Sequence, residues 1–252
     1  MDILDESGVE RVEGHEQEEA KSIHAGAEVA RMDDVLDTLA QPADASEPVV
    51  ALDERPVVLR DPARPGRPAS PGRMACQDYE YVRRGTANVF CIVKPKAGRH
   101  LTYATPNRTA KQFAQALRRI AQRYRSARTI HLVMDNLNTH RENSLCTTFG
   151  GDAGRELWSR FTVHYTPKHG SWLNPAENEA SLWSRECLGR LRIGSLSELR
   201  RRTSLWNKDA HRRRRKVRSP RGGRPVGGHP AGLQAKDVTT RRAGSVGISP
   251  TW

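Results

Sequence analysis

Short apolar runs that predict β-strands recur along most of the chain. Residues 49–53 and 129–134 are runs of the kind that form buried strands, and the acids Asp53 and Asp135 close them. Two further runs, joined around residues 84–86, favour a pair of antiparallel strands. The segments expected to form strands are residues 49–53, 79–82, 87–93, 101–104, 129–134 and 161–165.

Two segments carry the spacing of a helix with one buried face. From Thr109 onward, apolar residues recur at intervals of four, three and four, at Phe113, Leu117, Ile120 and Tyr124. Residues 175–191 carry a second apolar stripe, made of Ala176, Ala180, Trp183 and Cys187. Residues 141–158 favour a short helix and a loop.

The order of these elements predicts an α/β fold. Strands that are separated by helices pair in parallel through right-handed crossovers, whereas the early strands form an antiparallel meander. We therefore expect a mixed sheet flanked by helices over residues 46–206, with disordered or irregular ends.

Composition supports one domain with extensions. The chain has 252 residues, of which 36% are apolar and only 6% aromatic, enough for one medium domain. Residues 1–45 form an acidic lead-in whose one short helix would carry Val29, Met32, Leu36 and Leu39. Residues 61–73 are rich in Pro, Gly and Arg and predict an irregular loop, and residues 207–252 predict a disordered basic tail.

The charge is divided unevenly along the chain. Residues 1–54 hold 16 acidic and 3 basic residues, which leaves 13 acidic and 39 basic residues in 55–252. A body this basic attracts polyanions through counterion release, so nucleic acid is the first partner to consider. A solvated basic surface without a polyanionic partner is the alternative.

Membrane and disulfide classes are disfavoured. No run of about 18 apolar residues is present, and the N-terminus is acidic where a signal peptide would be basic, so we expect no membrane partner and a cytoplasmic location. The cysteines at 76, 91, 146 and 187 are scattered, which suits buried thiols in a reducing compartment.

Three carboxylates are candidates for metal chemistry. Asp53 and Asp135 end apolar strands, and Glu177 lies in the first turn of a late helix. If the two strands are parallel neighbours, three anions converge at one sheet edge, where hard ions such as Mg²⁺ would offset their repulsion. Two such ions would stabilise the attacking and leaving oxygens of a phosphodiester displacement.

Each of these acids also has a purely structural interpretation. Asp53 is followed by Glu54 and Pro56 and could serve a turn, and Asp135 could simply terminate a strand. Asn174 and Glu177 fit a capping box in which Glu177 accepts a hydrogen bond from the start of its own helix.

Several stretches resemble DDE-type transposases of bacterial insertion sequences, in the branch related to mariner elements. The stretches HLVMDNLNTH (131–140) and HYTPKHGSWLNPAENEASLWSRECLGR (164–190) are similar to the motifs that hold the second and third catalytic acids of that family. Residues 49–59 look like the strand of the first acid, and residues 65–90 resemble the loop and hairpin that follow it.

The resemblance implies a ribonuclease-H-like catalytic domain. It makes Asp53, Asp135 and Glu177 a triad that binds Mg²⁺ or Mn²⁺, with two ions, in a DNA endonuclease and strand transferase acting in DNA transposition and recombination. Transposon ends and target DNA would be its partners, and the family implies a homodimer. His140 and His169 would approach DNA or a phosphate unless they are structural.

Other features of the chain depart from the family. Nothing in residues 1–45 looks like the helix-turn-helix that reads transposon ends, which favours a truncated copy whose residues 1–28 and 210–252 exchange amide protons rapidly. A non-catalytic nucleic-acid-binding remnant of a transposase is the alternative function. We expect Trp172 to pack rather than stack on bases. We expect Glu179 to point away around the helix, so that replacing it leaves metal binding intact while Glu177→Gln weakens it.

Overall fold

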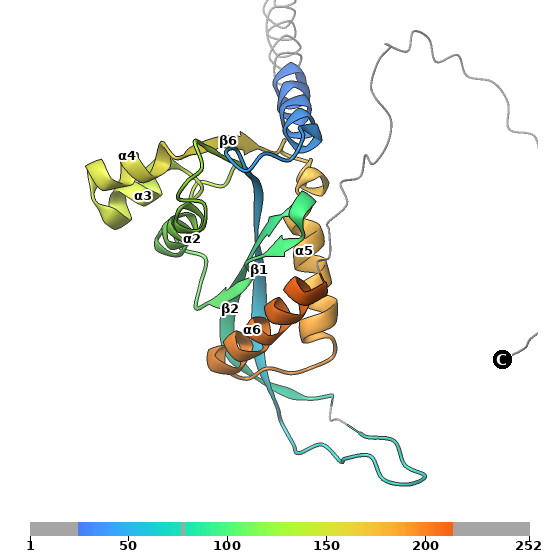
Figure 1. Cartoon of the computed structure of the whole chain (residues 1–252). Helices are drawn as coiled ribbons and strands as arrows, with labels where there is room; N and C mark the ends of the chain where they lie inside the picture. Colours follow the sequence, from blue (N-terminus) through green and yellow to red (C-terminus); the bar gives the residue numbers. More distant parts are fainter. Residues whose placement is uncertain (1–24, 77–78, 214–252) are drawn as a thin grey trace, which may run out of the picture. The chain divides into compact units, whose positions relative to one another are not determined.

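The computed structural model describes residues 25–76 and 79–213. Within that part of the chain, the centre is a six-stranded sheet with the order β3-β2-β1-β5-β6, and β4 also pairs with β2 (Figure 1). The strands are β1 (Val49–Pro62), β2 (Tyr81–Lys94), β3 (Arg99–His100), β4 (Tyr103–Thr105), β5 (Ile130–Met134) and β6 (Phe161–Tyr165).

The strand directions are mixed. β1 and β2 are antiparallel, as are β2 with β3 and β2 with β4, whereas β1 pairs with β5 and β5 pairs with β6 in parallel. This arrangement confirms the expected α/β class with a ribonuclease-H-like mixed sheet.

Helices cover both faces of the sheet. The helices are α2 (Ala110–Arg123), α3 (Glu142–Phe149), α4 (Gly151–Trp158), α5 (Pro175–Trp183) and α6 (Leu196–Arg213), and residues 25–40 are also helical. Short turns follow or precede some of them: η1 (Pro95–Ala97), η2 (Ser171–Leu173) and the π-turn η3 (Ser184–Leu188). α2, α3 and α4 lie to one side of the β1–β2 ribbon, and α5 and α6 to the other (Figure 1). None of the described helices combines the length and apolar character needed to cross a bilayer.

Alternation along β1 explains the two layers. Val50 and Leu52 belong to the cluster that contains the buried face of α2, whereas Ala51, between them, packs in the cluster that contains Ala176 of α5. Successive strand residues face opposite sides of a sheet, so residues an even number of positions apart on β1 share a face. We call this the parity of a residue, and it assigns the residue to the α2 face or the α5 face. By this rule Asp53 belongs to the α5 face.

The predicted hairpin around residues 84–86 is wrong. β2 runs without a break from Tyr81 to Lys94 and pairs with β1, which itself continues to Pro62. The register shifts between Val58 and Arg60 on β1, and Gly85 opposite has a φ of 101°. A glycine in this conformation accommodates a bulge inside a strand and does not require a turn.

The region of residues 141–158 forms two helices, where one helix and a loop were predicted. Gly150, with a φ of 95°, separates α3 from α4. A Cβ on Gly154 would lie 2.4 Å from backbone atoms of Cys146, so the two helices approach too closely for any other residue there.

The disordered basic tail was predicted to begin too early. Residues 207–213 are the last turns of α6, whose buried face consists of Leu199, Thr203, Trp206 and Ala210. The remaining tail residues 214–252, and residues 1–24 of the acidic lead-in, lie outside the described residues. The rapid amide exchange expected at both ends falls mainly on these segments and stays a prediction.

The cysteines are free thiols in different environments. Cys91 and Cys187 are buried as expected, but Cys146 is only partly buried and Cys76 is exposed in the loop that joins β1 to β2. The expectation of four buried thiols therefore fails for Cys76.

Candidate active site

The parallel pairing of β1 with β5 brings the first two candidate acids level. Ala51 pairs with Val133, and two further steps along both strands lead to Asp53 and Asp135. Neighbouring strands lie about 4.8 Å apart, so the two residues start from adjacent backbone positions. Asp135 follows the last residue of β5 as predicted, whereas β1 continues well past Asp53.

One asparagine ties the helix of the third acid to the strand of the first. Asn174 Nδ2 donates to the Leu52 carbonyl oxygen at 2.8 Å, and Asn174 Oδ1 accepts from the Ala176 N–H at 3.0 Å. Asn174 therefore caps α5 and anchors its start beside Asp53. Glu177 lies in the first turn that follows.

The expected capping box is only half formed. Asn174 caps the helix with its side chain, but its own N–H donates to the Ser171 carbonyl oxygen at 2.8 Å. The donor that Glu177 would accept from in a capping box is thus already used. The structure assigns Glu177 no part in capping through that N–H.

Electrostatics link the three acids. The pKa of Asp53 is raised to about 6, first by burial, against the effect of the Glu54 backbone N–H, which donates to Asp53 Oδ1 at 2.7 Å. The negative charges of Asp135, Glu177 and Glu54 contribute to the same rise. Asp53 therefore lies within the field of both other candidate acids.

The ring of His140 contacts the carboxylate of Asp135. Its Nδ1 lies 2.6 Å from Asp135 Oδ1 and its Nε2 lies 3.3 Å from Glu54 Oε1, while the ring stacks on Phe113 at 4.5 Å. Burial acts to lower the pKa of His140, but the hydrogen bonds and charges of Asp135 and Glu54 outweigh it and raise the pKa to about 9.

For His140 the structure supports the structural alternative over contact with DNA. The residue is fully buried and both ring nitrogens face carboxylates. Glu54 was missed by the sequence reasoning, although its position directly after Asp53 places it on the opposite face of β1. Glu54 Oε2 is buried and has no hydrogen-bond partner among the described residues.

Three other residues were singled out from the sequence: His169, Trp172 and Glu179. His169 is exposed, and Trp172, predicted to pack, is 53% exposed beside the helical segment of residues 25–40. Glu179 is fully buried, and its Oε1 accepts from Thr102 Oγ1 at 3.1 Å and lies 2.7 Å from His100 Nδ1. Glu179 thus contacts His100 of β3 and Thr102, which precedes β4, and that its replacement leaves metal binding intact stays a prediction.

The candidate acids suit a divalent ion in kind and in charge. Carboxylate oxygens are the ligands that Mg²⁺ and Mn²⁺ prefer, and a cation would relieve the repulsion that raises the pKa of Asp53. Among the described residues, however, no group of three or more His, Cys, Asp or Glu side chains is arranged to hold a metal ion. Asp135 instead lies against His140.

Comparison with solved structures finds transposase complexes. The structure of the Mos1 transposase paired-end complex with left transposon end is 17% identical, with a TM-score of 0.44 over 65% of this chain and 48% of that chain. The Mos1 mariner paired end complex with Mn is 16% identical, with a TM-score of 0.47 over 71% and 53%. The Mos1 Strand Transfer Complex is 14% identical, with a TM-score of 0.47 over 73% and 56%.

This chain spans about half the length of those transposase chains. A comparison with curated proteins gives no match. The profile of the family described as DDE superfamily endonuclease matches residues 48–200, which include β1, β5, β6, α5 and all three candidate acids. The chain therefore belongs to the DDE superfamily of endonucleases.

Proposed function

We propose that the chain is a transposase-type DNA endonuclease and strand transferase whose Asp53, Asp135 and Glu177 hold Mg²⁺ or Mn²⁺, with two ions. The observation that carries this proposal is the geometry that brings the three acids together: β1 pairs in parallel with β5, and Asn174 ties the start of α5 to Leu52 beside Asp53. The pKa of Asp53, raised first by burial and then by the like charges of Asp135 and Glu177, agrees with it. Family membership supports the reaction class. The solved structures that resemble this chain are complexes of a transposase with transposon ends, and DNA is the proposed partner here as well.

The chain's own residues would position the reacting groups. Asn174 sets the place of Glu177 relative to β1, and His140 sets the orientation of Asp135. When bound, the ions would stabilise the attacking and leaving oxygens of the phosphodiester. In the first step water would attack phosphorus, break its bond to the 3′-oxygen, and leave a 3′-hydroxyl and a 5′-phosphate. In the second step that 3′-hydroxyl would attack a phosphorus of target DNA and displace the 3′-hydroxyl of the target strand. A homodimer in the cytoplasm completes the proposal.

A non-catalytic DNA-binding remnant is the second candidate. The contact between Asp135 and His140, and the lack of an arranged ligand set among the described residues, favour this alternative. It predicts DNA binding that weakens steeply with salt and no cleavage with any divalent ion.

Nicking of supercoiled plasmid separates the two candidates. The wild-type protein should nick DNA only with Mg²⁺ or Mn²⁺, and Asp135→Asn should abolish the nicking. Asp152→Asn is the matched control, because the Asp152 side chain is fully exposed and pairs with Arg155 on α4. Equal nicking by wild type and Asp135→Asn, or none by either, would remove the catalytic proposal.

A further inference from the structure

The net positive charge of the chain originates in one continuous stretch. Residues 81–134 contain no Asp or Glu, whereas the other 198 residues hold 30 Lys and Arg against 29 Asp and Glu. The stretch covers β2, β3, β4, α2 and β5. Its cations are Arg83, Arg84, Lys94, Lys96, Arg99, Arg108, Lys111, Arg118, Arg119, Arg123, Arg125 and Arg128.

Most of these cations have no carboxylate partner. In the described part of the chain, Arg84 pairs with Asp61 and Arg128 with Glu47, and no described carboxylate lies within ion-pair distance of the other ten. α6 is also basic, but its Glu198 and Asp209 pair with four of its arginines. α2 contains no acid, so none of its cations has a carboxylate partner on the same helix.

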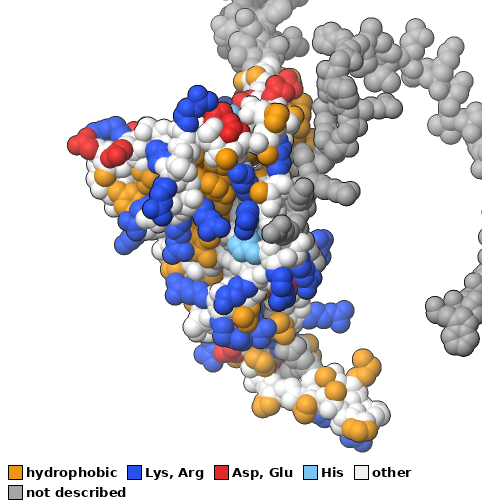
Figure 2. All heavy atoms as spheres, viewed as in Figure 1, with side chains coloured by type: hydrophobic (Ala, Val, Ile, Leu, Met, Phe, Trp, Pro, Cys, Tyr) orange, Lys and Arg blue, Asp and Glu red, His pale blue; other side chains and the backbone are white. Residues whose placement is uncertain are grey.

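Several of the unpaired cations converge beside the edge of the sheet. Lys94 and Arg99 are cross-strand partners on β2 and β3, and with Arg123 and His211 they line a hollow of about 60 Å³. The pKa of His211 is lowered, first by burial and then by positive charge that includes Arg123 and Arg99. Figure 2 shows Lys and Arg side chains around a histidine on this face, whereas acidic side chains gather near the helical segment of residues 25–40 and at the far end of α3 and α4.

His211 keeps a donor for an anion. Its Nε2 accepts from the His100 backbone N–H at 3.1 Å, so the proton of the neutral ring lies on Nδ1. Lys94, Arg99 and Arg123 offer further donors without a competing carboxylate in the lining of the hollow. A phosphate group would satisfy these donors.

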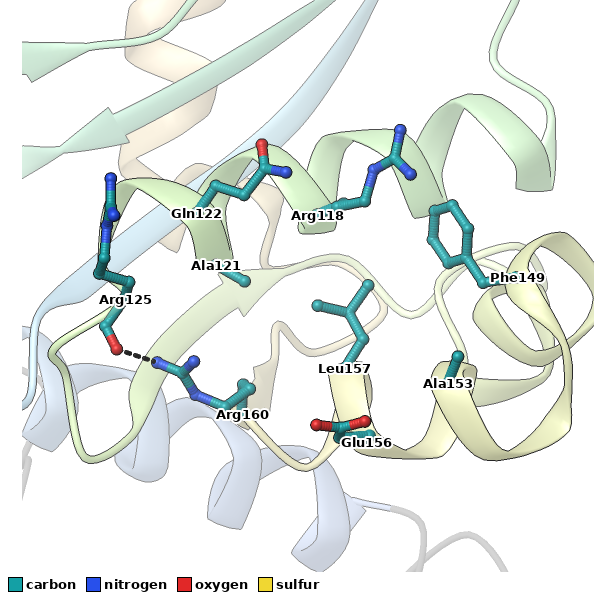
Figure 3. Close-up of a pocket in the computed structure, with 9 residues that line it drawn as sticks. All are labelled: Arg118, Ala121, Gln122, Arg125, Phe149, Ala153, Glu156, Leu157 and Arg160. Carbon is teal, nitrogen blue, oxygen red and sulfur yellow. Dashed lines mark hydrogen bonds between the residues drawn. The ribbon is translucent and has the colours of Figure 1, made fainter.

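The neighbouring groove between α2 and α4 is a weaker candidate. It is larger, about 460 Å³, but two of its three arginines, Arg118 and Arg160, are used within the protein (Figure 3). Arg118 lies over the Phe149 ring at 4.9 Å, and Arg160 donates to three backbone carbonyl oxygens at the end of α2. Glu156 adds a negative charge.

Lys94 lies on the opposite face of the sheet from Asp53. Phe90 and Ile92 belong to the α2 cluster, so Lys94, two residues further along β2, has the same parity and lies over Tyr124 of the same layer at 5.6 Å. Asp53 has the opposite parity and belongs to the α5 face. DNA bound at Lys94 and α2 therefore lies on the other face of the sheet from Asp53. One duplex could reach both places only by wrapping around the edge of the sheet.

We propose that the face formed by α2, β3 and the end of α6 binds the phosphate backbone of duplex DNA, separately from the strand that is cut. α2 is about 21 Å long at 1.5 Å per residue. A duplex carries one charge per about 1.7 Å of its axis, so this face can contact several phosphates. The inference rests on the proposed function only in the choice of DNA as the polyanion.

The test measures binding of a fluorescently labelled duplex of about 30 base pairs by fluorescence anisotropy, at salt concentrations between about 50 and 200 mM. The variant combines Arg99→Gln, Lys111→Gln and Arg123→Gln, all exposed positions. The matched control combines Arg31→Gln, Arg155→Gln and Arg201→Gln, which removes the same charge at positions paired with carboxylates and outside the proposed face. Thermal unfolding checks that both variants remain folded.

The first variant should weaken binding at least about tenfold and reduce the salt slope by about 0.9 for each lost phosphate contact. The control should stay within about threefold with an unchanged slope. An equal loss of affinity in both variants would mean that net charge alone explains the binding, and this would overturn the proposal. Tighter binding of duplex RNA of the same length would overturn it as well. Plasmid nicking by Asp135→Asn is scored separately, so loss of the catalytic proposal leaves this result interpretable.

Discussion

Asp53→Asn should stabilise the metal-free protein at neutral pH. The pKa of Asp53 is raised from 3.8 to about 6 in the folded state, so the charged carboxylate is less favourable there than in the unfolded chain. A difference of about 2 pKa units corresponds to about 3 kcal/mol. Asn avoids this cost but weakens the hydrogen bond from the Glu54 N–H by about 1 kcal/mol, which leaves a gain of about 1–2 kcal/mol.

The sign of the effect depends on pH. Because the folded pKa is above the unfolded one, the stability contributed by protonated Asp53 is fully present below pH 3.8 and is lost as pH rises through about 6. Asp53→Asn should therefore gain little at about pH 4 and its full amount above about pH 7. In a domain of this size the gain corresponds to a rise in Tm of about 2–8 °C.

Thermal unfolding in chelator, and then with Mg²⁺ or Mn²⁺, measures both halves of the prediction. Added metal should raise the Tm of the wild type, because bound cations favour the folded state, and should raise the Tm of Asp53→Asn much less. Asp152→Asn, at a fully exposed position, should change neither value. A destabilised Asp53→Asn at neutral pH, or an equal metal response in both proteins, would refute the reasoning.

Three further perturbations test the interior of the fold. Glu179→Ala should lower the free energy of unfolding in urea by about 3–5 kcal/mol, because it breaks the buried contacts of Glu179 with His100 and Thr102, whereas Asn178→Ala next to it should change it by less than about 0.5 kcal/mol. In metal-free buffer His140 should titrate near 9 by NMR, so its stabilising charge is present below pH 6.5 and lost as pH rises through about 9; a midpoint near 6.5 would contradict its contacts. Gly154→Ala should cost about 1–3 kcal/mol in chemical unfolding, while Gly26→Ala, with nothing within 4 Å, should not; equal effects would refute the close helix contact.

The elements that sequence predicts best are those whose pattern is local. The apolar runs that lead to Asp53 and Asp135 are short and continuous, as in buried strands, and Phe113, Leu117 and Ile120 follow helical spacing. All of these residues keep their predicted elements in the structure. The parallel order of β1 and β5 then follows from general rules of chain connection.

The features that sequence misses depend on distant partners. His140 is buried with its second ring nitrogen against the carboxylate of Glu54, 86 positions earlier. Glu179 is buried with its carboxylate against the ring of His100, 79 positions earlier. A local pattern cannot anticipate such pairs, and a charged residue alone predicts exposure. α6 was missed for another reason, since its buried face includes Thr203 and Ala210 among many arginines and has low apolar content.

The two hydrogen bonds of Asn174 make the position of Glu177 relative to Asp53 independent of the length of the loop before α5. Because this side chain joins the Leu52 carbonyl to the start of α5, the offset between Asp53 and Glu177 is set by an amide and not by the path of the chain after β6. Residues 166–170 could then gain or lose length in relatives while the third acid kept its place. Asn174→Asp, which retains the cap but loses the donor to Leu52, would remove that tolerance.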